Sequence, residues 1–248
     1  MSRRIRIAMS TAALAGLAAL LFWAFIGLPD FGHYRGPYGR MLNGSALSER
    51  HTTNVVAATV FDYRGLDTLG EEFILFTAVL GVVLLLRSSG KEEGDKDEPD
   101  EVVDSDSVTM VGILLVGLTV LIGLWLVAFG YITPGGGFQG GVVLASGAIL
   151  VWVARSHGAF SKLTPEVLLD PVEAVGAGGY AAVGIAALLA GLPFLHNLFG
   201  AGETGSLLSG GSIPLLNWAS AIEVAAANVI LCKEFLDEYV IPLARGEQ

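Results

Sequence analysis

The stretch VTMVGILLVGLTVLIGLWLVAFG, residues 108–130, decides the fold class of this chain. It contains no charged residue, and a helix of about 20 apolar residues crosses the roughly 30 Å hydrocarbon layer of a bilayer. The whole chain is similarly apolar, with 53% hydrophobic and 15% charged residues among 248 and a mean hydropathy of +0.63. Soluble domains carry about 25% charged residues. The composition therefore indicates an integral membrane protein.

Five further segments are apolar enough to cross a membrane. They are residues 7–28, a helix that ends at Leu86, residues 138–154, residues 172–192 and residues 215–240. The helix that ends at Leu86 has a charge-free core, residues 73–86, which covers only about 21 Å and is too short to span a bilayer. It must therefore include residues 67–72, whose carboxylates are drawn toward the membrane. The sequence predicts an all-α, polytopic membrane protein with about six transmembrane helices.

The distribution of positive charge predicts how these helices are oriented. With six spans, both termini lie on one side, together with residues 88–107 and 155–171. The opposite side then holds only four of the 14 Lys and Arg residues, namely Arg35, Arg40, Arg50 and Arg64. Because Lys and Arg concentrate on the cytoplasmic side of membrane proteins, we expect both termini in the cytoplasm and the chain in the cell membrane.

The first span has a second interpretation, as a secretory signal peptide, since Arg3, Arg4 and Arg6 precede it. Its apolar stretch, however, exceeds the roughly 7–15 residues typical of signal sequences, and no clear small-x-small cleavage site follows it. We therefore expect this segment to be retained as a membrane helix.

Acidic residues are concentrated in one polar segment. Residues 91–106 hold nine of the 24 Asp and Glu residues and only two lysines, so they account for most of the net charge of −10. Such a charge-dense stretch repels itself and stays solvated. We interpret residues 88–107 as an acidic cytoplasmic linker between a two-span module, residues 1–87, and a four-span domain, residues 108–248.

The composition argues against several classes of function. Nucleic-acid binding requires clustered Lys and Arg, and the net charge is −10. The single cysteine, Cys232, leaves no internal disulfide and no Cys-based metal cluster, and the four histidines are scattered. No nucleophile–base set of the Ser/His/Asp kind can be assembled. We therefore expect no catalytic residue, no metal ligand and no bound cofactor.

The stretch NVVAATVFDYRGLDTLGEE, residues 54–72, joins a short apolar run to a polar turn that opens onto the second span. Thr68 and Glu71 have the spacing of a capping box, and Asp67 and Glu71 share a helix face. These acids could simply cap the helix and complement its dipole. Carboxylates held near hydrocarbon are costly, however, and usually mark ion or proton paths. Asp67, Glu71 and Glu72 are therefore ion-path candidates beside the capping interpretation.

The stretch YITPGGGFQGG, residues 131–141, predicts a tight hairpin between the third and fourth spans. Its proline cannot extend the preceding helix, and three consecutive glycines let the chain reverse tightly. Two further glycines allow another backbone to approach the start of the fourth span. A phosphate-binding loop is excluded because no Gly-Lys-Ser/Thr follows. The residues assigned to this hairpin and its helix contact are Pro134, Gly135, Gly136, Gly137, Phe138, Gln139, Gly140 and Gly141.

The sixth span carries a carboxylate inside its apolar part, Glu223. It lies five residues beyond Trp218, about 8 Å along a helix. Alanines flank it and indicate a packed face, where a carboxylate would be protonated or paired. Both an ion-path role and a structural role stay open for this residue. Further along the span, Lys233 and Asp237 have the spacing of an ion pair at the cytoplasmic edge.

Two of these motifs resemble known membrane subunits. TPGGGFQGG, residues 133–141, lies between two apolar spans of a four-span unit and is similar to the B-type subunit of the Mrp sodium/proton antiporters, the MnhB family. That likeness covers residues 108–245. Residues 54–71 resemble the element that ends the large A-type subunit of those antiporters, and also the small E-type subunit of the related membrane-bound hydrogenase complexes. The two likenesses follow in the expected order and cover nearly everything except the acidic linker.

The resemblance implies a complex with A-, C-, D-, E-, F- and G-type partner subunits that exports Na⁺ in exchange for H⁺. By motif position, Glu71 matches an acid thought to matter for ion transport, and Pro134 and Phe138 match residues thought to matter for assembly or activity. Glu72 stands where the motif has an apolar residue. The fusion of A-like and B-like elements in one chain also departs from the usual separate subunits.

The sequence therefore predicts a membrane subunit of a Na⁺/H⁺ antiporter that contributes to pH and sodium homeostasis and has no catalytic site of its own. Its expected partners are the other antiporter subunits, Na⁺, H⁺ and the lipid bilayer, and no nucleic acid. One alternative is a subunit of the ion-translocating module of a hydrogenase-type complex related to complex I. An alternative of another class is a stand-alone membrane scaffold whose acids only cap helices.

Overall fold

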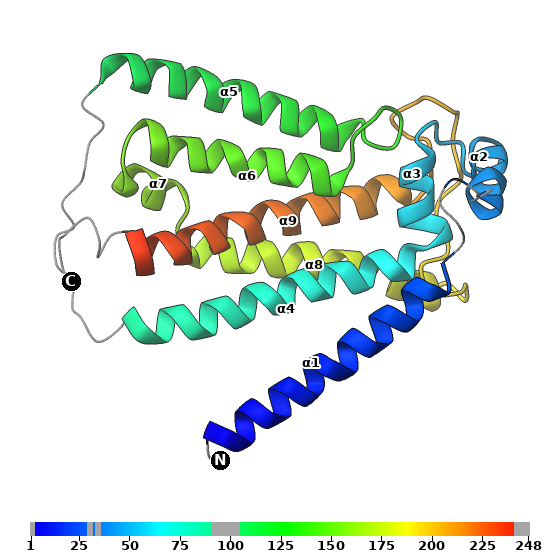
Figure 1. Cartoon of the computed structure of the whole chain (residues 1–248). Coiled ribbons are helices and arrows are strands. Elements are labelled where there is room, and N and C mark those ends of the chain that lie inside the picture. Colours follow the sequence, from blue (N-terminus) through cyan, green and yellow to red (C-terminus); the bar gives the residue numbers. More distant parts are fainter. Residues whose placement is uncertain (1–2, 29–31, 33–35, 91–104, 241–248) are drawn as a thin grey trace. The chain divides into compact units, whose positions relative to one another are not determined.

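The computed structural model describes residues 3–28, 32, 36–90 and 105–240, and its regular elements in these ranges are helices (Figure 1). The long helices are α1 (Arg3–Ile26), α4 (Gly65–Gly90), α5 (Asp106–Ala128), α6 (Gly137–Ala154), α8 (Glu166–Leu189) and α9 (Ile213–Phe235). The shorter elements are α2 (Pro37–Arg50), α3 (Val55–Ala58), α7 (His157–Leu163) and two π-helical segments, η1 (Thr59–Tyr63) and η2 (Leu236–Val240).

Six helices in the described part of the chain are long and apolar enough to cross a membrane, namely α1, α4, α5, α6, α8 and α9. This confirms the predicted all-α fold with about six transmembrane helices. It also makes the chain a multi-pass membrane protein. The orientation of its termini stays a prediction.

The chain forms two compact units, residues 1–41 and residues 42–248, which are described separately. In the first unit, the described side chains of α1 are all exposed, including Trp23 at 75%. A helix that is apolar on every side suits a lipid environment. The predicted division into two modules stays a prediction, and residues 91–104 of the predicted linker lie outside the described residues.

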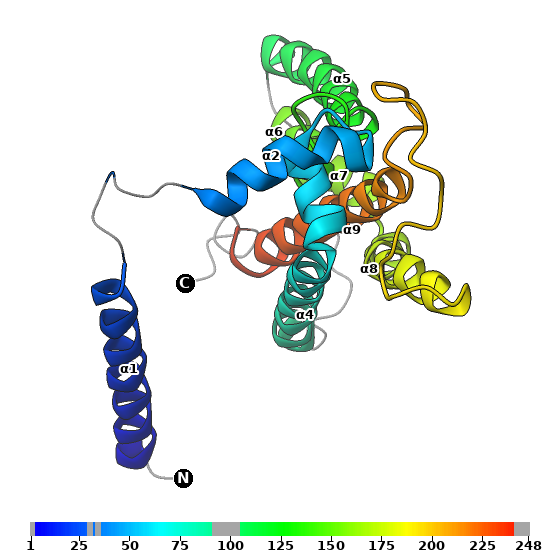
Figure 2. The same cartoon turned by 90° about the vertical axis from the view of Figure 1, so that its right-hand side faces the viewer.

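Helix α9 lies at the centre of the second unit. Figure 1 and Figure 2 show it running between α4, α6 and α8, with α5 packed beyond α6. In the most apolar stretch of α9, 61% of the residues are buried, whereas the corresponding shares are 11% in α4 and 17% in α5. Among the described helices, α9 therefore contributes the most buried residues to the core, and each outer helix turns one face away from the bundle.

Small residues bring these helices close together. Gly140 of α6 lies against α5, and Gly141 lies against Val224 of α9. On α8, Gly176 lies directly against the backbone of Glu223. Membrane helices associate largely through such close packing, because lipid tails are as apolar as the side chains they would replace. The glycines thus set the distances from α9 to its neighbours.

Helix α4 begins at Gly65, as the length of its apolar core requires. The predicted capping box is wrong, because the helix begins before Thr68 and no longer needs that residue as a cap. The Thr68 hydroxyl instead donates to the carbonyl oxygen of Val60 at 2.6 Å. Val60 belongs to η1, the π-helical turn that leads into α4. The threonine therefore ties the two elements together.

Helix α8 begins at Glu166, earlier than the predicted span of residues 172–192, and it contains Pro171. A proline removes one backbone hydrogen bond, which membrane helices tolerate when neighbouring groups hold them in place. Here Glu166, the first residue of α8, and Asp170, four positions later, form ion pairs with Arg87 of α4. These contacts support the extra turns at the start of α8.

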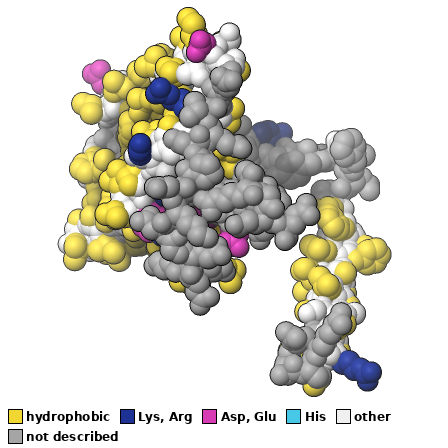
Figure 3. Space-filling view, turned by 90° about the vertical axis from the view of Figure 1, so that its left-hand side faces the viewer, with side chains coloured by type: hydrophobic (Ala, Val, Ile, Leu, Met, Phe, Trp, Pro, Cys, Tyr) yellow, Lys and Arg dark blue, Asp and Glu magenta, His cyan; other side chains and the backbone are white. Residues whose placement is uncertain are grey.

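Apolar side chains cover much of the outer surface of the second unit. Figure 3 looks onto the end where α4 ends and α5 begins, and it shows hydrophobic side chains over much of the described bundle. Leu85 of α4, Leu114 of α5 and Leu189 of α8 are 73%, 72% and 86% exposed. Exposed apolar surface of this extent requires lipid or neighbouring proteins to cover it.

The glycine contact between α8 and α9 can be tested by adding one methyl group. Gly176→Ala should lower the free energy of unfolding by about 1–3 kcal/mol, because overpacking a tight contact forces the backbone to shift. The new Cβ would lie 2.7 Å from the Cα of Glu223. Gly178→Ala is the matched control on the same helix, because its Cβ meets nothing within 4 Å. Thermal unfolding in one detergent compares them, and equal melting temperatures would contradict the packing.

Candidate ion-path site

Asn54 joins the two sequence motifs. Its side-chain nitrogen donates to the carbonyl oxygens of Gly130 at 2.6 Å and Thr133 at 3.1 Å. Its side-chain oxygen accepts hydrogen bonds from the backbone N–H groups of Val56 at 3.0 Å and Ala57 at 3.2 Å, which makes it the N-cap of α3. One side chain thus starts α3 and also holds the turn that precedes the glycine hairpin.

The residues beside Asn54 strengthen this joint. The hydroxyls of Thr52 and Thr53 donate to the carbonyl oxygens of Tyr131 and Ile132, each 79 positions away in the sequence. The backbone N–H of Asn54 donates to the carbonyl of Tyr131 at 3.2 Å. The segment before α3 is therefore bonded to the segment after α5, and the two motifs form one structural unit.

The glycine hairpin places the start of α6 directly against α9. Gly135 and Gly136 have φ values of 156° and 152°, which residues with a side chain rarely adopt. A Cβ at Gly137 would overlap the carbonyl oxygen of Asn217. The buried amide of Asn217 donates to the carbonyl oxygen of Val127 at 2.7 Å and so also ties α9 to the end of α5. A role of this hairpin in complex assembly stays a prediction.

The two motifs enclose a cavity of about 200 Å³. Glu71 lines it from α4, Phe61 lines it from η1, and residues 135–139 of the hairpin form another wall. Glu71 is the charged member of this lining and is exposed in the isolated chain. The arrangement places a carboxylate at the junction of the two motifs, with space beside it for water or an ion.

Glu72 follows Glu71 in the sequence but faces the inside of the bundle. It is fully buried, as is Glu223 of α9, and the two carboxyl groups interact beside the hydroxyl of Ser220. Within the described part of the chain, these carboxyl oxygens and the Ser220 hydroxyl have no hydrogen-bond partner of normal geometry. Buried polar atoms are normally hydrogen-bonded, so this unsatisfied group is a candidate functional site.

A third buried carboxylate, Glu173 of α8, was not among the candidates predicted from the sequence. It is 5% exposed, one of its oxygens has no hydrogen-bond partner among the described residues, and it interacts electrostatically with Glu223. The sequence pattern placed this residue at the edge of the fifth span, where acids are common. The sequence nevertheless held a signal that Glu173 faces another helix. Gly176 lies three positions further on, on the same helix face, and small residues of this kind mark close helix contacts.

Asp67 does not join the other predicted acids. Its side chain is 52% exposed and accepts a hydrogen bond from Nε of Arg64 at 2.6 Å. The structure therefore brings Glu72 and Glu223 together and leaves Asp67 apart from them. The fourth predicted acid, Glu71, lies beside the pair in sequence but on the separate cavity described above.

A larger polar cavity of about 770 Å³ opens at the end of the bundle where α4 begins. Asp67 lines it together with two further contacts between charged or polar groups, Arg50 to Asp62 at 2.5 Å and Tyr63 to Glu49 at 2.7 Å. Burial and the hydrogen bond to Glu49 raise the pKa of Tyr63 to about 12. We call this cavity the vestibule.

Tyr180 of α8 interacts with a residue that lines the vestibule and with one acid of the buried pair. The side chain is fully buried, and its hydroxyl donates to the carbonyl oxygen of Gly65 at 3.0 Å. Gly65 lines the vestibule, and the phenol of Tyr180 interacts electrostatically with Glu72. Tyr180 therefore links a residue that lines the vestibule to one of the buried carboxyl groups.

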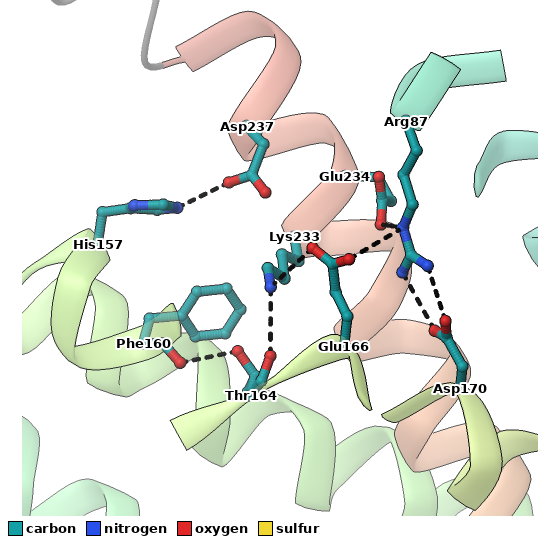
Figure 4. A network of polar contacts seen from close by, with 9 residues as sticks. All are labelled: Arg87, His157, Phe160, Thr164, Glu166, Asp170, Lys233, Glu234 and Asp237. Atoms are coloured by element: carbon teal, nitrogen blue, oxygen red, sulfur yellow. Dashed lines mark hydrogen bonds and ion pairs between the residues drawn. The ribbon is translucent and has the colours of Figure 1, made fainter. Parts of the chain in front are cut away.

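Arg87 ties three helices together at the opposite end of α4 (Figure 4). Its Nε donates to Glu234 of α9 at 2.6 Å, and its terminal nitrogens donate to Asp170 of α8 at 2.7 and 3.1 Å. Glu166 lies 3.8 Å from Arg87 and 3.3 Å from the Lys233 ammonium. The Glu234 side chain is only 5% exposed, so its contact with Arg87 lies inside the bundle, whereas Glu166 and Asp170 are half-exposed.

Lys233 and Asp237 have partners on other elements that their spacing did not reveal. Lys233 lies 3.3 Å from Glu166 and 3.4 Å from the carbonyl oxygen of Thr164, and Asp237 lies 2.8 Å from Nε2 of His157 (Figure 4). The partner residues His157, Glu166 and Thr164 belong to α7, to α8 and to the turn between these helices, respectively. Side chains at the end of α9 and in η2 therefore bind α7 and α8 to this end of the bundle.

Comparison with known proteins gives one family and two curated relatives. Residues 107–230, half of the chain, match the model of a domain related to the MnhB subunit of Na⁺/H⁺ antiporters. An uncharacterised protein of Methanocaldococcus jannaschii is 32% identical over 214 residues, which cover 75% of this chain and 80% of that protein. A probable K⁺/H⁺ antiporter A/B subunit of Rhizobium meliloti is 29% identical over 173 residues, which cover 60% of this chain and 17% of that protein.

Two solved structures share the fold. A chain of the membrane-bound sulfane sulfur reductase, an archaeal respiratory membrane complex, aligns with a TM-score of 0.69 and 26% identity over 94% of this chain and 98% of its own length. A chain of the Mrp complex from Dietzia sp. DQ12-45-1b aligns with a TM-score of 0.67 and 23% identity, over 96% of this chain and 26% of its own length. Both neighbours belong to multisubunit membrane complexes.

The joint at Asn54 predicts a measurable loss of stability. Asn54→Ala removes the N-cap of α3 and two hydrogen bonds to the hairpin turn, which should lower the free energy of unfolding by about 2 kcal/mol. Ser48→Ala is the control, because that exposed hydroxyl bonds only the local carbonyl of Ser45. Chemical unfolding of the purified variants measures the difference. An Asn54→Ala protein as stable as Ser48→Ala would refute the proposed joint.

The Arg87 network predicts a rescue by a second substitution. Arg87→Gln leaves the buried carboxylate of Glu234 without its main partner, which should cost about 3–5 kcal/mol. In Arg87→Gln/Glu234→Gln the uncompensated charge is gone, so part of that stability should return. Melting temperatures of the two variants decide the point, since a double variant no more stable than the single one would mean that charge pairing is not the cause.

Proposed function

This chain belongs to the family of domains related to the MnhB subunit of Na⁺/H⁺ antiporters, and we propose that, as a membrane subunit of the Mrp type, it contributes carboxylates to the path of the exchanged ions. The exchanged ions are Na⁺ and H⁺ in this proposal. The partners are A-, C-, D-, E-, F- and G-type subunits. The chain itself acts as a transporter component without a catalytic site.

One observation carries the proposal. Two motifs that are far apart in the sequence meet around Glu71, and the adjacent Glu72 faces Glu223 at full burial. Carboxylates that only cap a helix would lie at its end in contact with water and backbone N–H groups. Buried acids without a counter-charge are costly in a membrane and are retained where ions or protons pass. This favours the ion path over the capping interpretation.

In this proposal, each candidate residue has a role that follows from its position in the bundle. Glu71, beside open space, meets ions that approach the junction of the motifs. Glu72 and Glu223 form the buried stage of the path. The glycine hairpin holds α6 against α9, and the Asn54 joint keeps α4 in register with both. Asp67 lines the vestibule, which is the entrance of the path in this proposal, and its carboxylate offsets the positive charge of Arg64 there.

A second candidate function is supported by the likeness to the sulfane sulfur reductase complex, which covers nearly all of both chains at 26% identity. In that role the same subunit would belong to the ion-translocating module of a respiratory or hydrogenase-type membrane complex. Genes for redox-cofactor subunits beside the gene for this chain would favour this role. Their absence, together with genes for the other antiporter subunits, would favour the antiporter.

The ion-path proposal predicts the effect of neutralising Glu71. Glu71→Gln and Glu71→Ala should slow Na⁺-dependent exchange about tenfold or more, a barrier change of at least ~1.4 kcal/mol, because the first carboxylate on the path is lost. The measurement is the Na⁺-dependent ΔpH in everted membrane vesicles from cells that express the whole complex.

Glu203→Gln, which neutralises an exposed acid in the loop before α9, is the control and should exchange at the wild-type rate. Native gels with mass spectrometry show whether each variant still assembles with its partners. Full exchange by a normally assembled Glu71→Gln complex would refute the role of Glu71. Purification of the wild-type chain without any membrane partner would instead favour the scaffold.

A further inference from the structure

Glu72 of α4 and Glu223 of α9 present their carboxyl groups to each other at zero exposure. Ser220 lies one turn before Glu223, is also fully buried, and turns its hydroxyl toward Glu72. None of these side-chain oxygens has a hydrogen-bond partner of normal geometry among the described residues. On the α8 side, Gly176 packs against the backbone of Glu223 and closes the site.

The neighbouring groups that interact electrostatically with this pair are acidic or neutral. Glu71 on α4 and Glu173 on α8 add further negative charge, and Tyr180 on α8 contributes a phenol. Arg87 acts on Glu173, but its guanidinium is held by Glu234 at the far end of α4. In the described part of the chain, no Lys or Arg hydrogen-bonds the pair itself.

Without a proton or a bound cation, two ionised carboxylates cannot coexist in this setting. In a low-dielectric interior, like charges in contact repel strongly and both have lost their hydration. One proton resolves the conflict, because the protonated carboxyl donates a charge-assisted hydrogen bond to its ionised neighbour, as in other carboxyl pairs that share a proton. The Ser220 hydroxyl can donate a second hydrogen bond to the remaining charge.

We propose that Glu72 and Glu223 form one proton-binding site, which holds a single proton between the two carboxyl groups with Ser220 as an additional hydrogen-bond donor. A proton from water forms an O–H bond to one carboxylate and a hydrogen bond to the other, and its release breaks the same two contacts. This inference rests on the ion path proposed above and names its proton-carrying stage. Release leaves two negative charges, which an incoming cation would offset.

Infrared spectroscopy of the purified complex tests the site directly. A protonated carboxyl group has a C=O stretch distinct from that of a carboxylate, so the number of protonated groups can be compared between variants. Relative to wild type at neutral pH, Glu72→Gln/Glu223→Gln should lose the intensity of one protonated carboxyl per chain. No loss, or loss equal to two groups, would overturn the shared proton.

Three further variants separate the pair from its surroundings. Glu71→Gln and Glu173→Gln remove neighbouring carboxyl groups and should keep the band that the double variant loses. Ser220→Ala should shift the frequency of that band without removing it, because the carboxylate that accepts the shared proton loses one hydrogen-bond donor and then binds that proton more strongly. A band that disappears in Glu173→Gln and persists in the double variant would place the proton on Glu173 and refute the pair. Native gels verify that each complex assembles.

Vesicle transport measured on the same variants distinguishes this inference from the proposed function. If the double variant loses the band but exchanges Na⁺ for H⁺ at the wild-type rate, the proton site stands and its place on the ion path is refuted. If exchange is lost while the band is unchanged, the shared proton is refuted and the ion path stands.

Discussion

A carboxylate inside a membrane protein needs water, a counter-charge or a proton, and this requirement organises the second unit along its length. Each solution occurs at a different level of the bundle. Asp67 has an arginine at the vestibule, and Glu71 has the open space of a cavity. Glu234 has Arg87 at the other end of α4. Among the described residues no Lys or Arg hydrogen-bonds the buried pair in between, and the shared proton proposed above is its solution.

Two sets of polar contacts, one at each end of α4, hold this helix against the rest of the second unit. Near its start, Asn54 bonds the preceding segment to the turn before the glycine hairpin. Near its end, Arg87 forms ion pairs with α8 and α9. Because both ends are fixed to the family-related domain, the face of α4 that carries Glu72 is held against α9. The close glycine contacts of α6 and α8 with α9 pack the neighbouring backbones tightly around the same part of α9.

The same helical unit occurs in membrane complexes of different kinds. The archaeal sulfane sulfur reductase and the Dietzia Mrp complex each contain one polypeptide with a region of this fold. The fold by itself therefore does not decide between the two candidate functions proposed above.

Hydropathy along the chain determined the six membrane helices, because the cost of transferring a stretch of about 20 residues into lipid depends on that stretch alone. It also determined that α4 must carry acids toward the membrane. The sequence could not say which acid is buried, because Glu71 and Glu72 point about 100° apart on a helix and the packing of α4 against α9 sets that rotation. Nor could it show that Glu173 lies near Glu223, since their contact depends on two helices far apart in sequence meeting at a glycine. Tertiary packing alone decided which side chains met, because burial and partnership are properties of the assembled bundle.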